Sequence, residues 1–169
     1  MSVHAPLRCL LALSISFALP AVAQVLPAKA APAASPVARL PLVVVHKSPT
    51  CGCCTAWVAH MRKAGFPVDV REAADVTPVK RRVGVPAGKE SCHTAMVGGY
   101  FVEGHVPAAD VKRLLAEKPD AKGLAVPGMP LGSPGMEVPG GQTQPYAVEL
   151  VKRDGSSEVF ARHGIATGD

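Results

Sequence analysis

A strand–helix–strand pattern between residues 42 and 70 places the strongest constraint on the fold of this chain. Residues 42–45 and 68–70 are short apolar runs rich in β-branched side chains. Between them, apolar residues from Trp57 to Ala64 recur at helical spacing, with Thr50 as the expected helix cap and Gly65 as the terminating residue. Two strands joined by a helix within about 30 residues form a βαβ unit with parallel strands.

Further elements are predicted after this unit. A polar helix covers residues 75–84, a hairpin turns at Gly98-Gly99, and an amphipathic helix runs from Pro107 to about Lys118. A second hairpin turns at Asp154-Gly155. This order predicts an α/β, thioredoxin-like three-layer domain with an added C-terminal β-hairpin over residues 42–163, followed by a tail at 164–169.

Cysteines cluster where the first strand passes into the first helix. Cys51 and Cys54 have the C-x-x-C spacing of a redox pair, and Cys53 is surplus to that chemistry. A helix N-terminus lowers the pKa of a thiol, and the thiolate is both the nucleophile and the metal ligand. Cys92 and His93 lie just before the first hairpin strand. In a thioredoxin-like topology, the residues that precede this strand face the C-x-x-C loop. These residues are therefore expected to converge on a redox or metal site.

Methionines in the segment 126–137 indicate which metal the site would take. This segment is rich in proline and glycine, lacks periodicity and contains Met129 and Met136. Thioether and thiolate ligands together favour copper(I). His105, at the end of the second hairpin strand, is a further candidate ligand. The residues leave open two structural disulfides, a zinc site and a hydrophobic packing role for the methionines.

The N-terminus reads as an export signal. Residues 1–23 combine Arg8, an apolar run over 10–19 and the small-x-small tripeptide 21–23. That run is about ten residues long, too short for a membrane span of roughly 20. Residues 24–41 are rich in alanine and proline and are predicted to form a disordered linker. The mature protein is expected in the periplasm, without membrane insertion.

The charge pattern does not favour a nucleic-acid partner. The formal net charge is +5, and Lys80-Arg81-Arg82 forms a basic cluster without an aromatic platform. We interpret this cluster as a solvated helix face.

Four motifs in order resemble the CopG-type family of exported copper-resistance proteins, which is distinct from the DNA-binding repressor of the same name. The motifs are Lys47-Ser48-Pro49-Thr50-Cys51-Gly52-Cys53-Cys54, Ser91-Cys92-His93-Thr94, Glu103-Gly104-His105-Val106-Pro107, and Pro127-Gly128-Met129-Pro130 through Met136-Glu137. The resemblance implies a thioredoxin-like fold, a periplasmic location, links to copper-export systems and copper-binding or oxidoreductase activity. The implied ligands are Cys51, Cys53, Cys54, Cys92, His93 and His105, with Met129 and Met136 nearby, and a multinuclear copper–thiolate cluster is plausible.

Two mechanistic classes follow for a copper protein of this kind. The first buffers or delivers copper(I) without turnover. The second interconverts copper(I) and copper(II), with Cys51 and Cys54 as the catalytic dithiol–disulfide couple and a separate periplasmic redox partner. A third class, a thiol–disulfide oxidoreductase acting on exported proteins, leaves Cys53, His93 and the methionines unexplained.

Overall fold

The computed structural model describes Met1 and residues 39–164. The expected signal peptide (1–23), most of the expected linker (24–41) and most of the expected tail (164–169) lie outside these residues. Within residues 39–164, no helix is both long enough and apolar enough to cross a membrane.

The described region is a mixed α/β structure with one sheet of seven strands and three helices. In chain order the elements are β1 (Val43–Lys47), α1 (Gly52–Lys63), β2 (Val68–Glu72), α2 (Thr77–Val83), β3 (His93–Val97), β4 (Tyr100–Glu103), α3 (Ala108–Glu117), β5 (Ala121–Ala125), β6 (Tyr146–Lys152) and β7 (Ser157–His163).

The strands lie in the order β2-β1-β3-β4-β5-β6-β7. β1 and β2 pair in parallel, with Val45 opposite Val70, which confirms the pairing predicted from the βαβ pattern. β3 runs antiparallel to both β1 and β4. β5 pairs in parallel with β4, and β6 pairs antiparallel with both β5 and β7.

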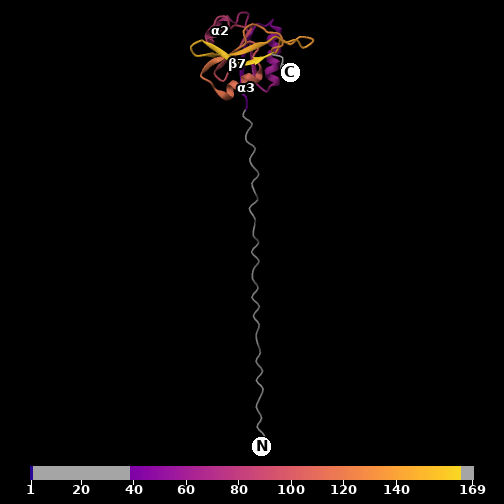
Figure 1. Cartoon of the computed structure of the whole chain (residues 1–169), viewed down its shortest axis with the longest axis vertical. Helices are drawn as coiled ribbons and strands as arrows, with labels where there is room; N and C mark the ends of the chain where they lie inside the picture. Colours follow the sequence, from indigo (N-terminus) through magenta and orange to yellow (C-terminus); the bar gives the residue numbers. More distant parts are fainter. Residues whose placement is uncertain (2–38, 165–169) are drawn as a thin grey trace. The chain divides into compact units, whose positions relative to one another are not determined.

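Helices cover both faces of the sheet because side chains alternate along each strand. On one face, α1 and α3 contribute residues such as Trp57 and Leu114 to the larger core cluster. On the other face, Val83 at the end of α2 packs with a smaller cluster that contains Phe101. Figure 1 shows α2 and α3 on opposite sides of the strand layer. The cysteine-bearing start of α1 is thereby fixed at the C-terminal end of β1.

The structure corrects two details of the expected elements. The N-cap of α1 is Cys51 and not Thr50, because the Cys51 Sγ accepts the backbone N–H of Cys54. Strand β5 is an element that the sequence pattern did not predict. Its glycine, Gly123, lies so close to β4 that an added Cβ would collide with the backbone carbonyl of Phe101.

A third correction concerns the basic cluster on α2. Arg81 and Arg82 are exposed, as expected for a solvated face, but Lys80 is buried. The Lys80 ammonium forms an ion pair with the carboxylate of Glu103 at the end of β4. The cluster is therefore only partly a solvated helix face.

Candidate metal centre

The start of α1 brings three cysteines together at the C-terminal end of β1. Cys51 and Cys54 form a disulfide with a Cα–Cα distance of 5.3 Å. The thiol of Cys53 is free and partly buried, and its Sγ lies 3.5 Å from the Cys51 Sγ. Because Cys51 precedes the helix while Cys53 and Cys54 occupy its first turn, the chain folds back and gathers all three sulfur atoms.

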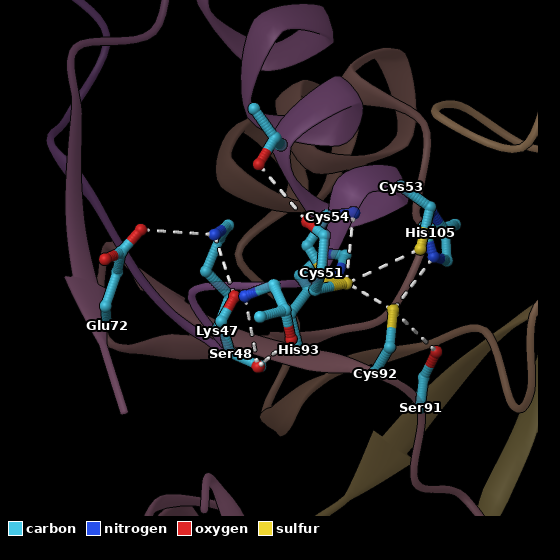
Figure 2. Close-up of a disulfide and its surroundings, with 12 residues drawn as sticks. Lys47, Ser48, Cys51, Cys53, Cys54, Glu72, Ser91, Cys92, His93 and His105 are labelled. Carbon is cyan, nitrogen blue, oxygen red and sulfur yellow. Dashed lines mark hydrogen bonds and ion pairs between the residues drawn. A yellow bond between two sulfur atoms is a disulfide. The ribbon is translucent and has the colours of Figure 1, made fainter. Parts of the chain in front are cut away.

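The fourth cysteine approaches this turn from the sheet. Cys92 immediately precedes β3, its thiol is free, and His93 is the first residue of that strand. The Cys92 Sγ lies 3.0 Å from Nε2 of His105 and 3.4 Å from Nδ1 of His93. Figure 2 shows the sulfur atoms of Cys51, Cys53 and Cys92 turned toward one another, with the His105 ring beside them.

The His105 ring is held in one tautomer by the backbone. Its Nδ1 lies 2.8 Å from the carbonyl oxygen of Pro134, and a carbonyl can only accept a hydrogen bond. Nδ1 therefore carries the proton, and Nε2 presents its lone pair toward Cys92. A histidine that ligates a metal is commonly oriented by such a partner on its other nitrogen. Burial lowers the pKa of His105, which favours the neutral imidazole required of a ligand.

His93 is also fully buried. Burial, together with the neighbouring His105 and Lys80, lowers the pKa of His93 to about 3, so its ring is neutral at physiological pH. The His93 ring packs against Trp57 in a tilted arrangement, with ring centroids 4.5 Å apart and an interplanar angle of 45°. Among the described residues, Nε2 of His93 is a buried side-chain atom without a hydrogen-bond partner. The ring is thus held mainly by packing, with Nδ1 directed at Cys92.

The surroundings of the Cys92 thiol disfavour its ionised form. Burial is the main cause, and the charge of a neighbouring Cys53 thiolate adds to it, so that the pKa of Cys92 rises to about 11. The expectation that a helix N-terminus lowers the pKa of a thiol concerns the cysteines at the start of α1, whereas Cys92 lies just before β3. A bound cation would replace the proton of Cys92.

The potential ligand atoms fall into two overlapping groups. One contains the sulfur atoms of Cys51, Cys53, Cys54 and Cys92, and the other contains ligand atoms of Cys92, His93 and His105. Within each group, all of these atoms lie within 4.8 Å of one another. A thiolate-rich group joined to two imidazoles fits soft or borderline metals and not calcium or magnesium.

A buried polar network supports the segment that carries Cys92. The carboxylate of Glu103 accepts hydrogen bonds from the Ser91 backbone N–H at 2.7 Å and from the Thr94 hydroxyl at 2.6 Å, and it pairs with Lys80. Burial raises the pKa of Glu103, while these three donors oppose that effect. Since Ser91 and Thr94 flank Cys92-His93, the network fixes the backbone on both sides of two predicted ligands.

The two methionines occupy different positions in the loop between β5 and β6. Met129 is 52% exposed and lines a pocket of about 420 Å³ together with Pro130 and Tyr146. Met136 is partly buried and follows Gly135, whose position leaves no room for a Cβ beside the Cys53 carbonyl oxygen. The loop therefore packs closely on the start of α1 near Met136, whereas Met129 lies beside a separate pocket.

Sequence reasoning missed several supporting groups. The Pro134 carbonyl, which accepts the hydrogen bond of His105, belongs to the loop between β5 and β6. A sequence does not show which carbonyl a distant histidine will contact. Nε2 of His60, on α1, accepts the Ala108 backbone N–H at 3.0 Å. His163 contacts Asp110 at 2.6 Å and links β7 to α3. Both contacts join segments about 50 residues apart, which a local sequence pattern does not reveal.

The chain is similar to a described protein family and to two solved structures. Residues 89–136 match a family described as a protein of unknown function, DUF411. No curated protein matches the chain significantly. A solved structure entitled copper resistance protein CopG, form 1, is 45% identical, with a TM-score of 0.70, and the alignment covers 75% of this chain and 99% of that one. Form 2 is 46% identical over 73% of this chain and 98% of that one, also with a TM-score of 0.70. The chain belongs to the CopG family of copper resistance proteins.

Proposed function

We propose that this protein binds copper(I) in the periplasm and contributes to copper resistance or homeostasis. The observation that carries the proposal is the convergence of four cysteine sulfur atoms and two neutral imidazoles at the start of α1. The ligands are Cys51, Cys53, Cys54, Cys92, His93 and His105, with Met129 and Met136 as peripheral thioethers. Two solved relatives carry the name copper resistance protein, which supports copper as the cargo.

The donor set favours copper(I) over zinc. A structural zinc site closes with four ligands in a tetrahedron. Here six candidate ligands share one region, and four of them are cysteine sulfur atoms, which become four thiols when the Cys51–Cys54 disulfide is reduced. Thiolates bridge soft monovalent ions readily, so a multinuclear copper–thiolate cluster uses these ligands more fully than a single zinc ion does.

Oxidoreductase activity toward copper is the second part of the proposal. The Cys51–Cys54 disulfide at the start of α1 supports a dithiol–disulfide couple. Two copper(I) ions would each lose one electron to become copper(II), and the disulfide would take up both electrons and two protons to give two thiols. A separate periplasmic redox partner would reoxidise the thiols, and the reverse direction would require a partner that reduces the disulfide.

The fold and location belong to the same proposal. The order β2-β1-β3-β4, with parallel β1 and β2 and helices on both faces, supports a thioredoxin-like domain over residues 42–163. Residues 1–23 would direct export and be removed, which N-terminal sequencing of the secreted protein would test. Delivery of copper to an export system would follow from that location.

Anaerobic copper(I) titration of the reduced mature protein tests the binding proposal. The wild-type protein is expected to bind several copper ions, and Cys51→Ser and Cys92→Ser are each expected to lower the stoichiometry and the affinity. Ala59→Ser, exposed on the same helix, serves as the control and should bind like the wild type. Wild-type stoichiometry and affinity in both cysteine variants would overturn the proposed site.

A thiol–disulfide oxidoreductase acting on exported proteins is the second candidate. The placement of a disulfide at a helix N-terminus, beside a free thiol, favours it. Reduction of a protein disulfide by the reduced chain, together with an absence of tight copper binding, would support this function and overturn the first.

A further inference from the structure

The two ligand groups of the site respond differently to the disulfide. Cys51 and Cys54 both belong to the four-cysteine group, so their disulfide removes two of its four thiolates. The second group contains Cys92, His93 and His105 and includes neither of these cysteines. The disulfide therefore leaves every member of the second group available.

The second group is already arranged for a ligand while the disulfide is present. The lone pair of His105 Nε2 faces Cys92 because Nδ1 donates to Pro134. Nδ1 of His93 lies 3.4 Å from the same sulfur atom. Both rings are fully buried, whereas Cys92 is partly buried. Nε2 of His93 lacks a partner among the described residues, so packing orients that ring.

We propose that the protein contains two overlapping copper(I) sites, between which the Cys51–Cys54 disulfide selects. The dithiol state assembles a thiolate cluster that includes Cys92. The disulfide state retains a mononuclear site formed by the Cys92 thiolate and the imidazoles of His93 and His105. This inference rests on the copper binding proposed above. It adds that the number of bound copper ions and the type of their ligands differ between the dithiol and disulfide states.

The ligand chemistry of the second site fits a single copper ion. One thiolate and two imidazoles make a trigonal N₂S set, and a set of this composition binds copper in other proteins. Cys92 bridges the two groups, so a copper ion held there in the disulfide state needs no rearrangement of β3. Disulfide formation would pass two electrons from the Cys51 and Cys54 sulfur atoms to the periplasmic redox partner proposed above and would release any protons that these thiols carry. Loss of the cluster in that step would then release all copper ions except one.

A Cys51→Ser/Cys54→Ser variant isolates the second site, because it lacks both thiolates and cannot take part in thiol redox chemistry. Anaerobic copper(I) titration of this full-length variant is expected to give one copper per chain, against several for the reduced wild type. X-ray absorption is expected to show nitrogen and sulfur neighbours in the variant and a mainly sulfur shell in the wild type.

Added substitutions assign the ligands within that background. Cys92→Ser or His105→Ala is expected to lower copper(I) affinity at least tenfold, because second-site ligands are lost. Ala59→Ser, exposed on α1, is the matched control and should leave the single copper unchanged. Cys53→Ser tests whether the Cys53 sulfur atom joins the second site, and the single copper is expected to survive it. Thermal unfolding of each variant confirms that the variant is folded.

The outcomes separate this inference from the function on which it rests. Several copper ions on the reduced wild type, with none on the double variant, would retain the proposed function and overturn the second site. A single copper that survives His105→Ala or is lost with Cys53→Ser would also overturn it. Absence of copper from the reduced wild type would overturn the proposed function itself.

Discussion

Cys92 has to lose a proton before it can bind a metal, and its surroundings make that loss difficult. Burial raises the pKa of its thiol to about 11, with a contribution from Cys53. At neutral pH, copper binding would therefore release this proton, and the affinity of the site should rise as the pH increases toward that value. The Cys92 thiol ionises at a lower pH in the unfolded chain than in the folded one. This thiol consequently destabilises the fold as the pH rises from the ordinary thiol pKa of about 8.5 through about 11.

The raised pKa predicts slow alkylation of Cys92. In the metal-free disulfide form, the iodoacetamide rate at Cys92 should rise about tenfold per pH unit from pH 7 to pH 9, because only the thiolate reacts. Peptide mapping by mass spectrometry resolves Cys92 from Cys53. In the urea-unfolded chain, the alkylation rate at Cys92 should instead stop rising with pH above the ordinary thiol pKa of about 8.5. A plateau near pH 8 in the folded protein would contradict the buried, protonated thiol.

At the scale of elements, the pairing of β5 with β4 requires a glycine at position 123. A Cβ at Gly123 would collide with the Phe101 backbone carbonyl in β4. Gly123→Ala must push the two strands apart, so we expect a loss of about 1–3 kcal/mol in the free energy of unfolding. Gly52, at the start of α1, has open space around its Cα. Gly52→Ala should therefore be stabilising by about 0.4–1 kcal/mol, because alanine restricts the unfolded chain more than glycine does. Urea unfolding of both variants checks the contrast, and equal effects would contradict it.

The contact between α2 and β4 depends on a buried ion pair. Lys80→Met would leave the Glu103 carboxylate buried without its cation, which should cost about 3–5 kcal/mol. Arg81→Met, on an exposed position of the same helix, should change stability by less than about 0.5 kcal/mol. Chemical denaturation measures both values. Because Glu103 also holds Ser91, copper(I) affinity should fall in Lys80→Met, whereas Arg81→Met should bind like the wild type.

At the scale of the whole molecule, periodicity and turn residues predicted much of the secondary structure. The helix around Trp57 and the turn at Gly98-Gly99 follow from local patterns, and the structure contains both. Strand β5 escaped prediction because Ala121-Lys122-Gly123 has low strand propensity, and it forms because β4 and β6 enclose it. Tertiary context overrides propensity at such a position.

The grouping of the candidate ligands was predictable from the sequence, but the contacts that hold them were not. Cysteine spacing and the position of Cys92 before a strand pointed to one cluster, and the structure groups these sulfur atoms. The partners of His105 and Glu103 come from distant segments and carry no local pattern. Whether Met129 and Met136 bind copper stays a prediction.

The redox proposals require that the domain remain folded without its disulfide. The Cys51–Cys54 bridge joins residues only three positions apart, so it restricts the unfolded chain little and should contribute about 2 kcal/mol by the loop-entropy relation. The larger core cluster, which includes Trp57, Phe66 and Leu114, contains no cysteine and does not depend on the bridge. Urea unfolding with and without a phosphine reductant should therefore show one cooperative transition in each state, with a modestly lower midpoint when reduced. The Cys51→Ser/Cys54→Ser variant should give the same midpoint under both conditions. If the reduced wild type were unfolded, copper binding would have to drive folding, and a preformed thiolate site would be wrong.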